Sequence, residues 1–155
     1  LNLLKDKIDF RSIIIGRGYY YKSLQKFLLN KRLNDKVKII NWQKNPYKYL
    51  KSSDLLVLTS KYEGLPNILL EAVSLKKNVI STDCPTGPRE ILDNGKGGDL
   101  FRIGDFQQLS KKIILFSKNK KKYDNKLKFA YERLKRFDYN KNLKLYLKEI
   151  KSEMN

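Results

Sequence analysis

The sequence predicts an α/β domain in which a parallel sheet is flanked by helices. Two observations support this fold class. Short apolar runs rich in β-branched residues alternate along the chain with segments of helical spacing, which favours right-handed βαβ units and a parallel sheet. One of these runs, "DLLVLTS" at 54–60, is apolar almost throughout, as is typical of a strand buried on both faces. The 155 residues are enough for one domain with a sizeable core.

The first third of the chain predicts two strands, each followed by a helix. The run "RSIII" at 11–15 reads as a buried strand, and "GRG" after it as a tight turn. A helix is expected over 19–33 and a second strand over 35–40. Pro46 then begins a short helix at 46–52. The residues expected to point inward from these two helices are Tyr20, Leu24, Phe27, Leu28, Tyr47 and Leu50.

After the strand at 54–60, residues 66–76 have helical spacing and 78–82 form the next strand. One or two helical turns at 88–94 stop at Gly95, and 98–101 is a last short strand. Three helices close the chain at 105–117, about 120–135 and 139–152. The opening residues, 1–10, read as the tail of an amphipathic helix, so we expect a fragment of a longer protein that forms a single domain over 1–155.

Composition excludes several kinds of chemistry. The chain has no histidine, which rules out Ser-His and Cys-His catalysis and any metal site built on imidazoles. Its single cysteine, Cys84, excludes an internal disulfide and is expected to be a small buried hydrophobe. No apolar run approaches the roughly 18 residues that span a membrane, and no signal peptide is visible, so we expect a cytoplasmic protein.

The formal net charge is +18, from 34 basic and 16 acidic residues. Such an excess favours polyanionic neighbours, namely nucleic acid, anionic lipid or phosphorylated substrates. The abundance of Lys, Asn, Ile and Tyr also fits an AT-rich coding sequence, which would explain the charge without any function. The charge alone leaves both explanations open.

The stretch "SKYEGLPNILLEA" at 60–72 joins the third strand to its helix, where parallel sheets bind ligands. The helix is expected to begin at Pro66, which leaves the amides of Asn67, Ile68 and Leu69 free at its N-terminus. Free amides and the helix dipole suit a pyrophosphate, and Gly64 would let the backbone approach it closely.

Two glutamates flank this helix start. Glu71 lies in the second helical turn, and helical side chains lean toward the N-terminus, so its carboxylate would reach beside the phosphate and accept hydrogen bonds from a ribose diol. Glu63 lies on the loop before the helix and would face a sugar attached to the far phosphate. The structural alternative is that Glu63 is an exposed loop acid and Glu71 a surface residue of the helix.

With these residues in place, "SKYEGLPNILLEAVSLKKNVISTDCPTGPREIL" resembles the C-terminal donor-binding half of the retaining glycosyltransferases of GT-B fold, family 4 (glycosyl transferases group 1). The family pattern is Glu, seven residues, Glu, usually "EG(F/L)(G/P)xxxLEA". A strand follows, then a loop that ends "PE(I/L)". The upstream segments "IIIGRG", "VKIINW" and "YLKSSDLLVL" occur in family order. The resemblance covers about residues 10–103 and implies a Rossmann-like half of a GT-B enzyme of bacterial surface polysaccharide synthesis.

The resemblance implies a role for each matching residue. Glu71 would bind the nucleotide ribose, and Glu63 would contact donor-sugar hydroxyls near the reacting centre. The backbone of 65–68, which includes Leu65, would hold the distal phosphate. Trp42 would stack on the base, although a place in the core or against another domain fits it equally well. No metal and no cofactor are expected.

The sequence departs from the family at several points. The Arg and Lys that clamp the pyrophosphate belong to an earlier strand-loop that this sequence lacks, as it lacks the acceptor domain. Arg17 is a candidate substitute for the clamp, or else a solvated loop residue. Arg89 replaces a small or hydrophobic residue, and either faces the cleft or pairs with Glu90 or Asp93.

The expected partners are a nucleotide-diphosphate sugar, most simply a UDP-sugar, and a growing glycan or lipid-linked acceptor. Residues 118–136 carry nine basic and two acidic side chains, which suggests either electrostatic attachment to an anionic membrane surface or a docked helix with a solvated basic face. Two other functions stay open: a basic module that binds nucleic acid, for which no RNA-binding signature is visible, and a nucleotide-sugar epimerase of the same architecture, in which histidine would be expected.

Overall fold

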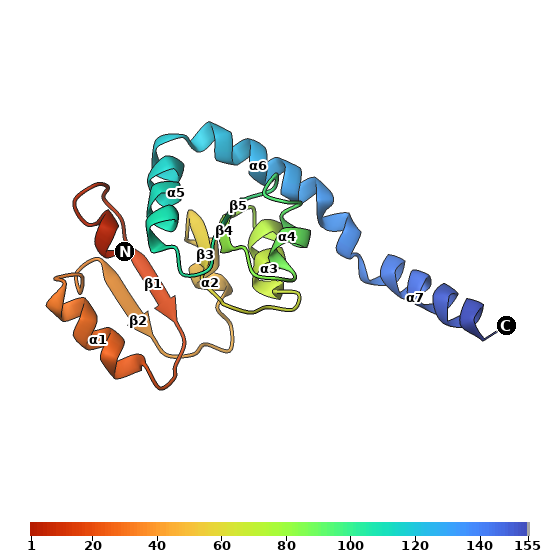
Figure 1. The fold of residues 1–155 in the computed structure, drawn as a ribbon, viewed down its shortest axis with the longest axis horizontal. Helices are drawn as coiled ribbons and strands as arrows, with labels where there is room; N and C mark the ends of the chain where they lie inside the picture. The colour runs from red at the N-terminus through yellow and green to blue at the C-terminus, as the bar shows by residue number, and fades with distance from the viewer. Residues whose placement is uncertain (155) are drawn as a thin grey trace.

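The computed structural model describes residues 1–154 and confirms an α/β fold with parallel strands (Figure 1). Strands β1 (Ser12–Ile15) and β2 (Val37–Ile40) pair in parallel. Strands β3 (Leu55–Leu58), β4 (Asn78–Thr82) and β5 (Asp99–Phe101) form a second parallel group with β4 in the middle. The sheet predicted from the sequence is therefore present as two hydrogen-bonded groups of two and three strands.

Helices follow the strands in the predicted order. They are η1 (Asn2–Leu4), α1 (Tyr21–Asn30), α2 (Tyr47–Lys51), α3 (Asn67–Ser74), α4 (Pro88–Ile91), α5 (Phe106–Lys118), α6 (Lys120–Arg133), η2 (Leu134–Phe137) and α7 (Tyr139–Glu153). None of them, within residues 1–154, combines the length and apolar character needed to cross a membrane.

The main core lies on the two faces of the three-stranded group. Successive strand residues point to opposite faces, so Val79 packs with α3 and α4 while Ile80 packs with Phe116 and Tyr123 of α5 and α6. Strand β3 was expected to be buried on both faces, but all four of its residues are only half-buried. The reason is its place at the edge of its group, where one side lacks a neighbouring strand.

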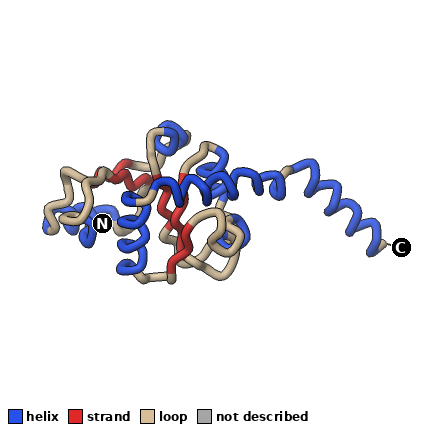
Figure 2. Tube along the Cα trace, turned by 90° about the horizontal axis from the view of Figure 1, so that it is seen from above, coloured by secondary structure: helices blue, strands red, loops and turns tan. Residues whose placement is uncertain are grey.

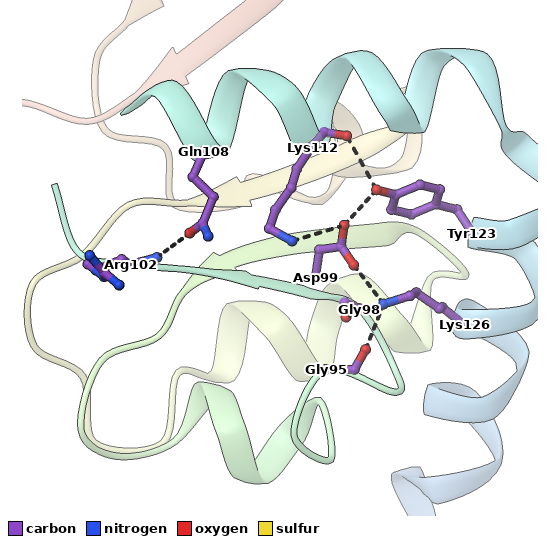
Figure 3. Close-up of polar contacts among 8 residues, drawn as sticks. All are labelled: Gly95, Gly98, Asp99, Arg102, Gln108, Lys112, Tyr123 and Lys126. Carbon is purple, nitrogen blue, oxygen red and sulfur yellow. Dashed lines mark hydrogen bonds and ion pairs between the residues drawn. The ribbon is translucent and has the colours of Figure 1, made fainter. Parts of the chain in front are cut away.

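A buried ionic cluster around Asp99 fixes α5 and α6 to the start of β5 (Figure 3). The Tyr123 hydroxyl donates to Asp99 Oδ2 at 2.6 Å, and Lys126 Nζ donates to Oδ1 at 2.6 Å. Lys126 also donates to the carbonyls of Gly95 and Gly98, and Lys112 lies 3.7 Å from Asp99 Oδ2. Every charge here has a partner, which is the condition under which a buried ion pair is tolerated.

The cluster sets the charge states of its members. Burial opposes ionisation of Asp99, but the hydrogen bonds from Lys126 and Tyr123 and the two lysine charges outweigh it and lower the pKa of Asp99. Burial and the adjacent Asp99 raise the pKa of Tyr123 far above its ordinary value. Lys126 is therefore partly buried and paired with Asp99, although the sequence suggested a solvated basic face for this stretch.

Several predicted inward positions are wrong. Phe27 and Tyr20 are exposed, and Leu28 is the buried residue of α1, because this helix covers only the narrow two-stranded group. Tyr47 is 40% exposed although Leu50, one turn later, is buried. Residues 1–10 contain only the short turn η1, with Leu4 buried, and no tail of an amphipathic helix.

The two final helices behave differently. Helix α6 docks on the domain through Tyr123 and Ala130, so the docked alternative for this segment is confirmed. Helix α7 extends away from the domain, and its C-terminal end lies far from the sheets (Figures 1 and 2). None of its described residues is buried. The apolar side chains it leaves exposed are Tyr139, Leu143, Leu145, Tyr146, Leu147 and Ile150.

Candidate functional site

The loops that follow β3 and β4 are joined at the carboxyl ends of these neighbouring strands. The Thr82 hydroxyl donates to the Ser60 carbonyl at 2.7 Å, and the Thr86 hydroxyl donates to the Glu63 carbonyl. Each hydroxyl therefore ties one loop to the backbone of the other. In an open parallel sheet, this edge is where ligands bind.

Gly87 is the point of closest approach between the two loops. A Cβ at this position would lie 2.5 Å from Pro66 Cδ and still closer to the Gly64 carbonyl oxygen. Its backbone, at φ +80° and ψ −70°, has a γ-turn conformation that residues with a side chain rarely adopt. Only glycine fits both conditions, so Gly87 is a structural requirement of the site that the sequence reading did not identify.

Helix α3 presents its N-terminus at this junction. Pro66 is the N-cap residue and the helix begins at Asn67, one residue later than predicted. The Leu69 amide donates to the Pro66 carbonyl at 2.9 Å, so the prediction that it is free is wrong. For the amides of Asn67 and Ile68, no acceptor is found anywhere in residues 1–154. Two amide donors and the positive end of the helix dipole are thus available to an anion.

The approach to these amides is open. Gly64 is exposed, and a Cβ placed on it would meet no atom within 4 Å. Neither backbone conformation nor packing therefore requires glycine at 64, in contrast to Gly87. Leu65 and Asn67 are exposed beside it, while Pro66 is buried and Ile68 half-buried against the core.

The two glutamates lie on either side of this helix start, and both are half-buried. The Glu63 carboxylate forms no hydrogen bond or ion pair with any residue from 1 to 154, although its backbone is held by Thr86. Interaction with the Glu71 carboxylate raises the pKa of Tyr47, the first residue of α2. Neither glutamate is fully exposed or fully buried.

Arg89 points to a partner that the sequence reading did not consider. Its guanidinium binds both carboxylate oxygens of Asp83, at 2.6 Å each, and not Glu90 or Asp93. The hydrogen bond from Arg89 lowers the pKa of Asp83, although partial burial opposes it. Asp93 instead pairs with Arg133 at 2.9 Å. The bidentate pair connects the first turn of α4 to the loop after β4.

The remaining predicted residues come from other loops. Arg17 is exposed in the loop after β1, and Trp42, in the loop after β2, is 64% exposed. This exposure contradicts the core position considered for Trp42. Cys84 is buried, as expected of a small hydrophobe. No group of three or more carboxylates or thiols in residues 1–154 is arranged to hold a metal ion.

A separate groove of about 670 Å³ lies beside α1 and β2, lined by residues such as Gln25, Leu28 and Lys38. None of the predicted site residues lines it. The loops after β3 and β4 carry the chemistry: amide donors for an anion, an acid suited to a diol and a second acid with no protein partner. Thr86 and Gly87 are the members of this site that the sequence reading missed, since each acts through a contact distant in the chain.

Comparisons with known proteins identify the family of this chain. The family model described as "Glycosyl transferases group 1" matches residues 1–133. An uncharacterised glycosyltransferase of Methanocaldococcus jannaschii is 50% identical over 80 residues, which are 52% of this chain and 20% of that protein. An N-acetylgalactosaminyltransferase of Campylobacter jejuni, whose name gives a diphospho-undecaprenol-linked sugar as the acceptor, is 31% identical over 136 residues, which are 85% of this chain and 36% of that protein.

Solved structures show the same fold. The structure of Anabaena Alr3699/HepE in complex with UDP has a TM-score of 0.87 at 21% identity, over 97% of this chain and 43% of that one. The apo lipopolysaccharide outer core galactosyltransferase WaaB has a TM-score of 0.73 at 27% identity, over 86% of this chain and 39% of that one.

The chain thus spans about a fifth to a third of the length of the curated relatives reported above, and less than half of the solved chains. Over that span, the matched family model covers the strands, the two joined loops, α3 and all of α6. The chain belongs to the glycosyl transferases group 1 family.

Proposed function

We propose that this chain is the donor-binding half of a larger enzyme that transfers a hexose or N-acetylhexosamine from a UDP-sugar to a growing glycan or lipid-linked acceptor. The observation that carries the proposal is the junction of the loops after β3 and β4. Along the chain, the free amides of Asn67 and Ile68 follow Glu63 and precede Glu71. The order of groups matches that of a nucleotide sugar: ribose, diphosphate, sugar.

Each group has one role in this proposal. Glu71 accepts hydrogen bonds from the ribose hydroxyls, and the exposed Trp42 stacks on the base. Within the backbone of 65–68, the free amides of Asn67 and Ile68 bind the distal phosphate, which Gly64 admits to close range. Glu63 contacts hydroxyls of the sugar. Arg17 is placed to approach the diphosphate, whereas Arg89 supports the loop through Asp83 and does not bind the donor.

Catalysis in this arrangement is electrostatic. The bond between the anomeric carbon and the distal phosphate oxygen breaks, and negative charge develops on the diphosphate as it leaves. A preorganised helix N-terminus stabilises that charge more than it stabilises the intact donor. The acceptor oxygen bonds to the same face of the anomeric carbon, with retention, and its proton passes to the departing phosphate.

The test is product analysis of the full-length protein, of its Glu63→Ala variant and of this 155-residue chain alone, each with a panel of UDP-sugars and a lipid-linked acceptor. We expect the full-length protein to form a new α-glycoside and UDP, the variant to lose most of its transfer rate, and the chain alone to be inactive because it lacks the acceptor half. Epimerised sugar with no transfer, or strong salt-dependent DNA binding with no UDP binding, would overturn the proposal.

We also propose that the basic surface over 118–136 attaches the enzyme electrostatically to an anionic membrane that carries the acceptor, at the cytoplasmic side. Tyr123 and Ala130, two members of the apolar stripe of this segment, are buried in the domain. The attachment therefore rests on lysines such as Lys121 and Lys128, which are exposed, and it does not involve insertion of the helix.

A further inference from the structure

The segment 61–65, which carries Glu63, is held in place by very few contacts. Within residues 1–154, its backbone takes part in a single hydrogen bond, which the Thr86 hydroxyl donates to the Glu63 carbonyl. The next residue is Gly64, which has the widest backbone freedom of any residue type and no atom within 4 Å of its Cβ position. Without Thr86, the peptide group between Glu63 and Gly64 could therefore rotate, and the direction of the Glu63 side chain would change with it.

The loop that carries Thr86, residues 83–88, is itself well anchored. The Asp83 amide donates to the Phe101 carbonyl of β5 at 2.7 Å. The Asp83 carboxylate accepts two hydrogen bonds from the Arg89 guanidinium, at 2.6 Å each. A fixed loop thus presents the Thr86 hydroxyl to a segment that has no other hydrogen bond in the part of the chain that the structure describes.

We propose that Thr86 is a positioning residue for sugar transfer: its hydrogen bond to the Glu63 carbonyl holds the Glu63 carboxylate where it meets the donor sugar. The inference rests on the proposed function, because it gives Glu63 the sugar as its ligand. The carboxylate is half-buried, and no side chain within residues 1–154 binds it, so its direction depends on its own backbone. A carboxylate placed before the sugar arrives loses less freedom on binding.

Thr82 makes a similar contact but has a different role. Its hydroxyl donates to the Ser60 carbonyl at 2.7 Å, at the other end of the segment. Thr82 is buried at the end of β4, so a substitution there would disturb the core. Thr86 is exposed, and Thr86→Val removes its hydroxyl without repacking the interior.

The chain offers a matched control in Thr59, the first residue after β3. Thr59 is also exposed, and its hydroxyl has no hydrogen-bond partner within residues 1–154. Thr59→Val and Thr86→Val therefore make the same chemical change, and only the second removes a contact to Glu63. Thr86→Ser completes the set, because it keeps the hydroxyl and loses only the methyl group.

The experiment measures two quantities on the full-length protein and these variants: the affinity for UDP, and kcat for transfer from the UDP-sugar that the wild type uses. We expect Thr86→Val to lower kcat about three- to tenfold, the range that one hydrogen bond supports. Its affinity for UDP should not change, because UDP has no sugar to meet Glu63. Thr86→Ser should restore kcat, and Thr59→Val should change neither quantity.

A second comparison tests whether Thr86 acts through Glu63. If it does, adding Thr86→Val to Glu63→Ala should cause no further loss of the residual transfer rate, because residues that act as a unit are not additive. A further loss by the same factor as in the wild type would overturn the inference.

Two other results would overturn it. A wild-type kcat in Thr86→Val would show that the hydroxyl does not position Glu63. A parallel loss of UDP affinity and kcat would reduce Thr86 to a residue that only maintains the loop. The proposed function is judged separately, from the wild type and Glu63→Ala: no transfer from any UDP-sugar by the wild type would overturn the donor site itself, and full activity in Glu63→Ala would remove Glu63 from it.

Discussion

Gly87 and Gly64 both lie in the joined loops, but only Gly87 is required by its backbone conformation and its packing. This difference gives a quantitative prediction for the two alanine substitutions. For Gly87→Ala, the left-handed backbone costs about 1–3 kcal/mol for a residue with a side chain. The added Cβ also overlaps the Gly64 carbonyl and Pro66, and overpacking of this kind typically costs about 1–3 kcal/mol. We therefore expect the free energy of unfolding to fall by about 2–6 kcal/mol.

Gly64→Ala should behave in the opposite way. Its Cβ meets no atom within 4 Å and its φ is not positive, so stability should stay within about 0.5 kcal/mol of the wild type. If a phosphate approaches the backbone at this point, however, the added methyl group obstructs it. We expect UDP affinity to drop at least tenfold in a variant that remains as stable as the wild type.

Urea unfolding and thermal melting, with UDP binding measured on the same samples, test both substitutions. A loss of 2 kcal/mol corresponds to a decrease in melting temperature of about 4–8 °C for a domain of this size. Gly87→Ala with wild-type stability would refute the close approach of the two loops. Gly64→Ala with wild-type UDP affinity would refute the phosphate path over Gly64.

Three further predictions follow from single contacts. Glu71→Gln should weaken UDP binding by about 1.5–3 kcal/mol, since an amide replaces a charged acceptor; unchanged affinity in calorimetry would remove Glu71 from the site. Folding lowers the pKa of Asp99, so the stability that ionised Asp99 contributes is complete above its unfolded pKa of about 3.9 and is lost as the pH falls through its folded pKa. Asp99→Asn should therefore make the free energy of unfolding less dependent on pH in the acid range, and an unchanged dependence would contradict this. Lys121→Glu with Lys128→Glu should reduce binding to anionic vesicles, most clearly at low salt; equal binding to neutral and anionic vesicles by the wild type would contradict membrane attachment.

Much of the fold follows from local pattern. The runs at 11–15, 35–40, 54–60 and 78–82 all contain a strand, because a short β-branched or apolar run between turn residues has few other stable forms. The three closing helices lie within a few residues of their predicted bounds for the same reason. Pro66 marks the start of α3 to within one residue, since a helix tolerates proline only in its first turn.

What the sequence could not predict depends on contacts between distant segments. Whether Phe27 of α1 or Tyr47 of α2 is buried depends on how wide a surface the strands offer to that helix. The spacing of apolar residues along the helix does not contain this information. Lys126 reads as one of many surface lysines until Asp99 is placed beside it. Gly87 and Thr86 acquire their roles only when the loop after β4 meets the loop after β3.

The sequence points to candidate site residues only where a local motif marks them, and gives no sign of those that depend on contacts between distant segments. Glu63 and Glu71 could be found because the strand, the proline and the helix fix their places along the chain. The sequence leaves Arg89 either facing the cleft or paired with Glu90 or Asp93, because the fold of the loop that brings Asp83 to it cannot be read from spacing.

The position of the diphosphate in a complex of the full-length protein with UDP tests the central claim most directly. A crystal structure should place oxygens of the distal phosphate within about 2.7–3.2 Å of the amide nitrogens of Asn67 and Ile68, with the ribose hydroxyls on Glu71. A diphosphate bound elsewhere, for example among the lysines of α6 or in the groove beside α1, would contradict the assignment of the donor site to the start of α3.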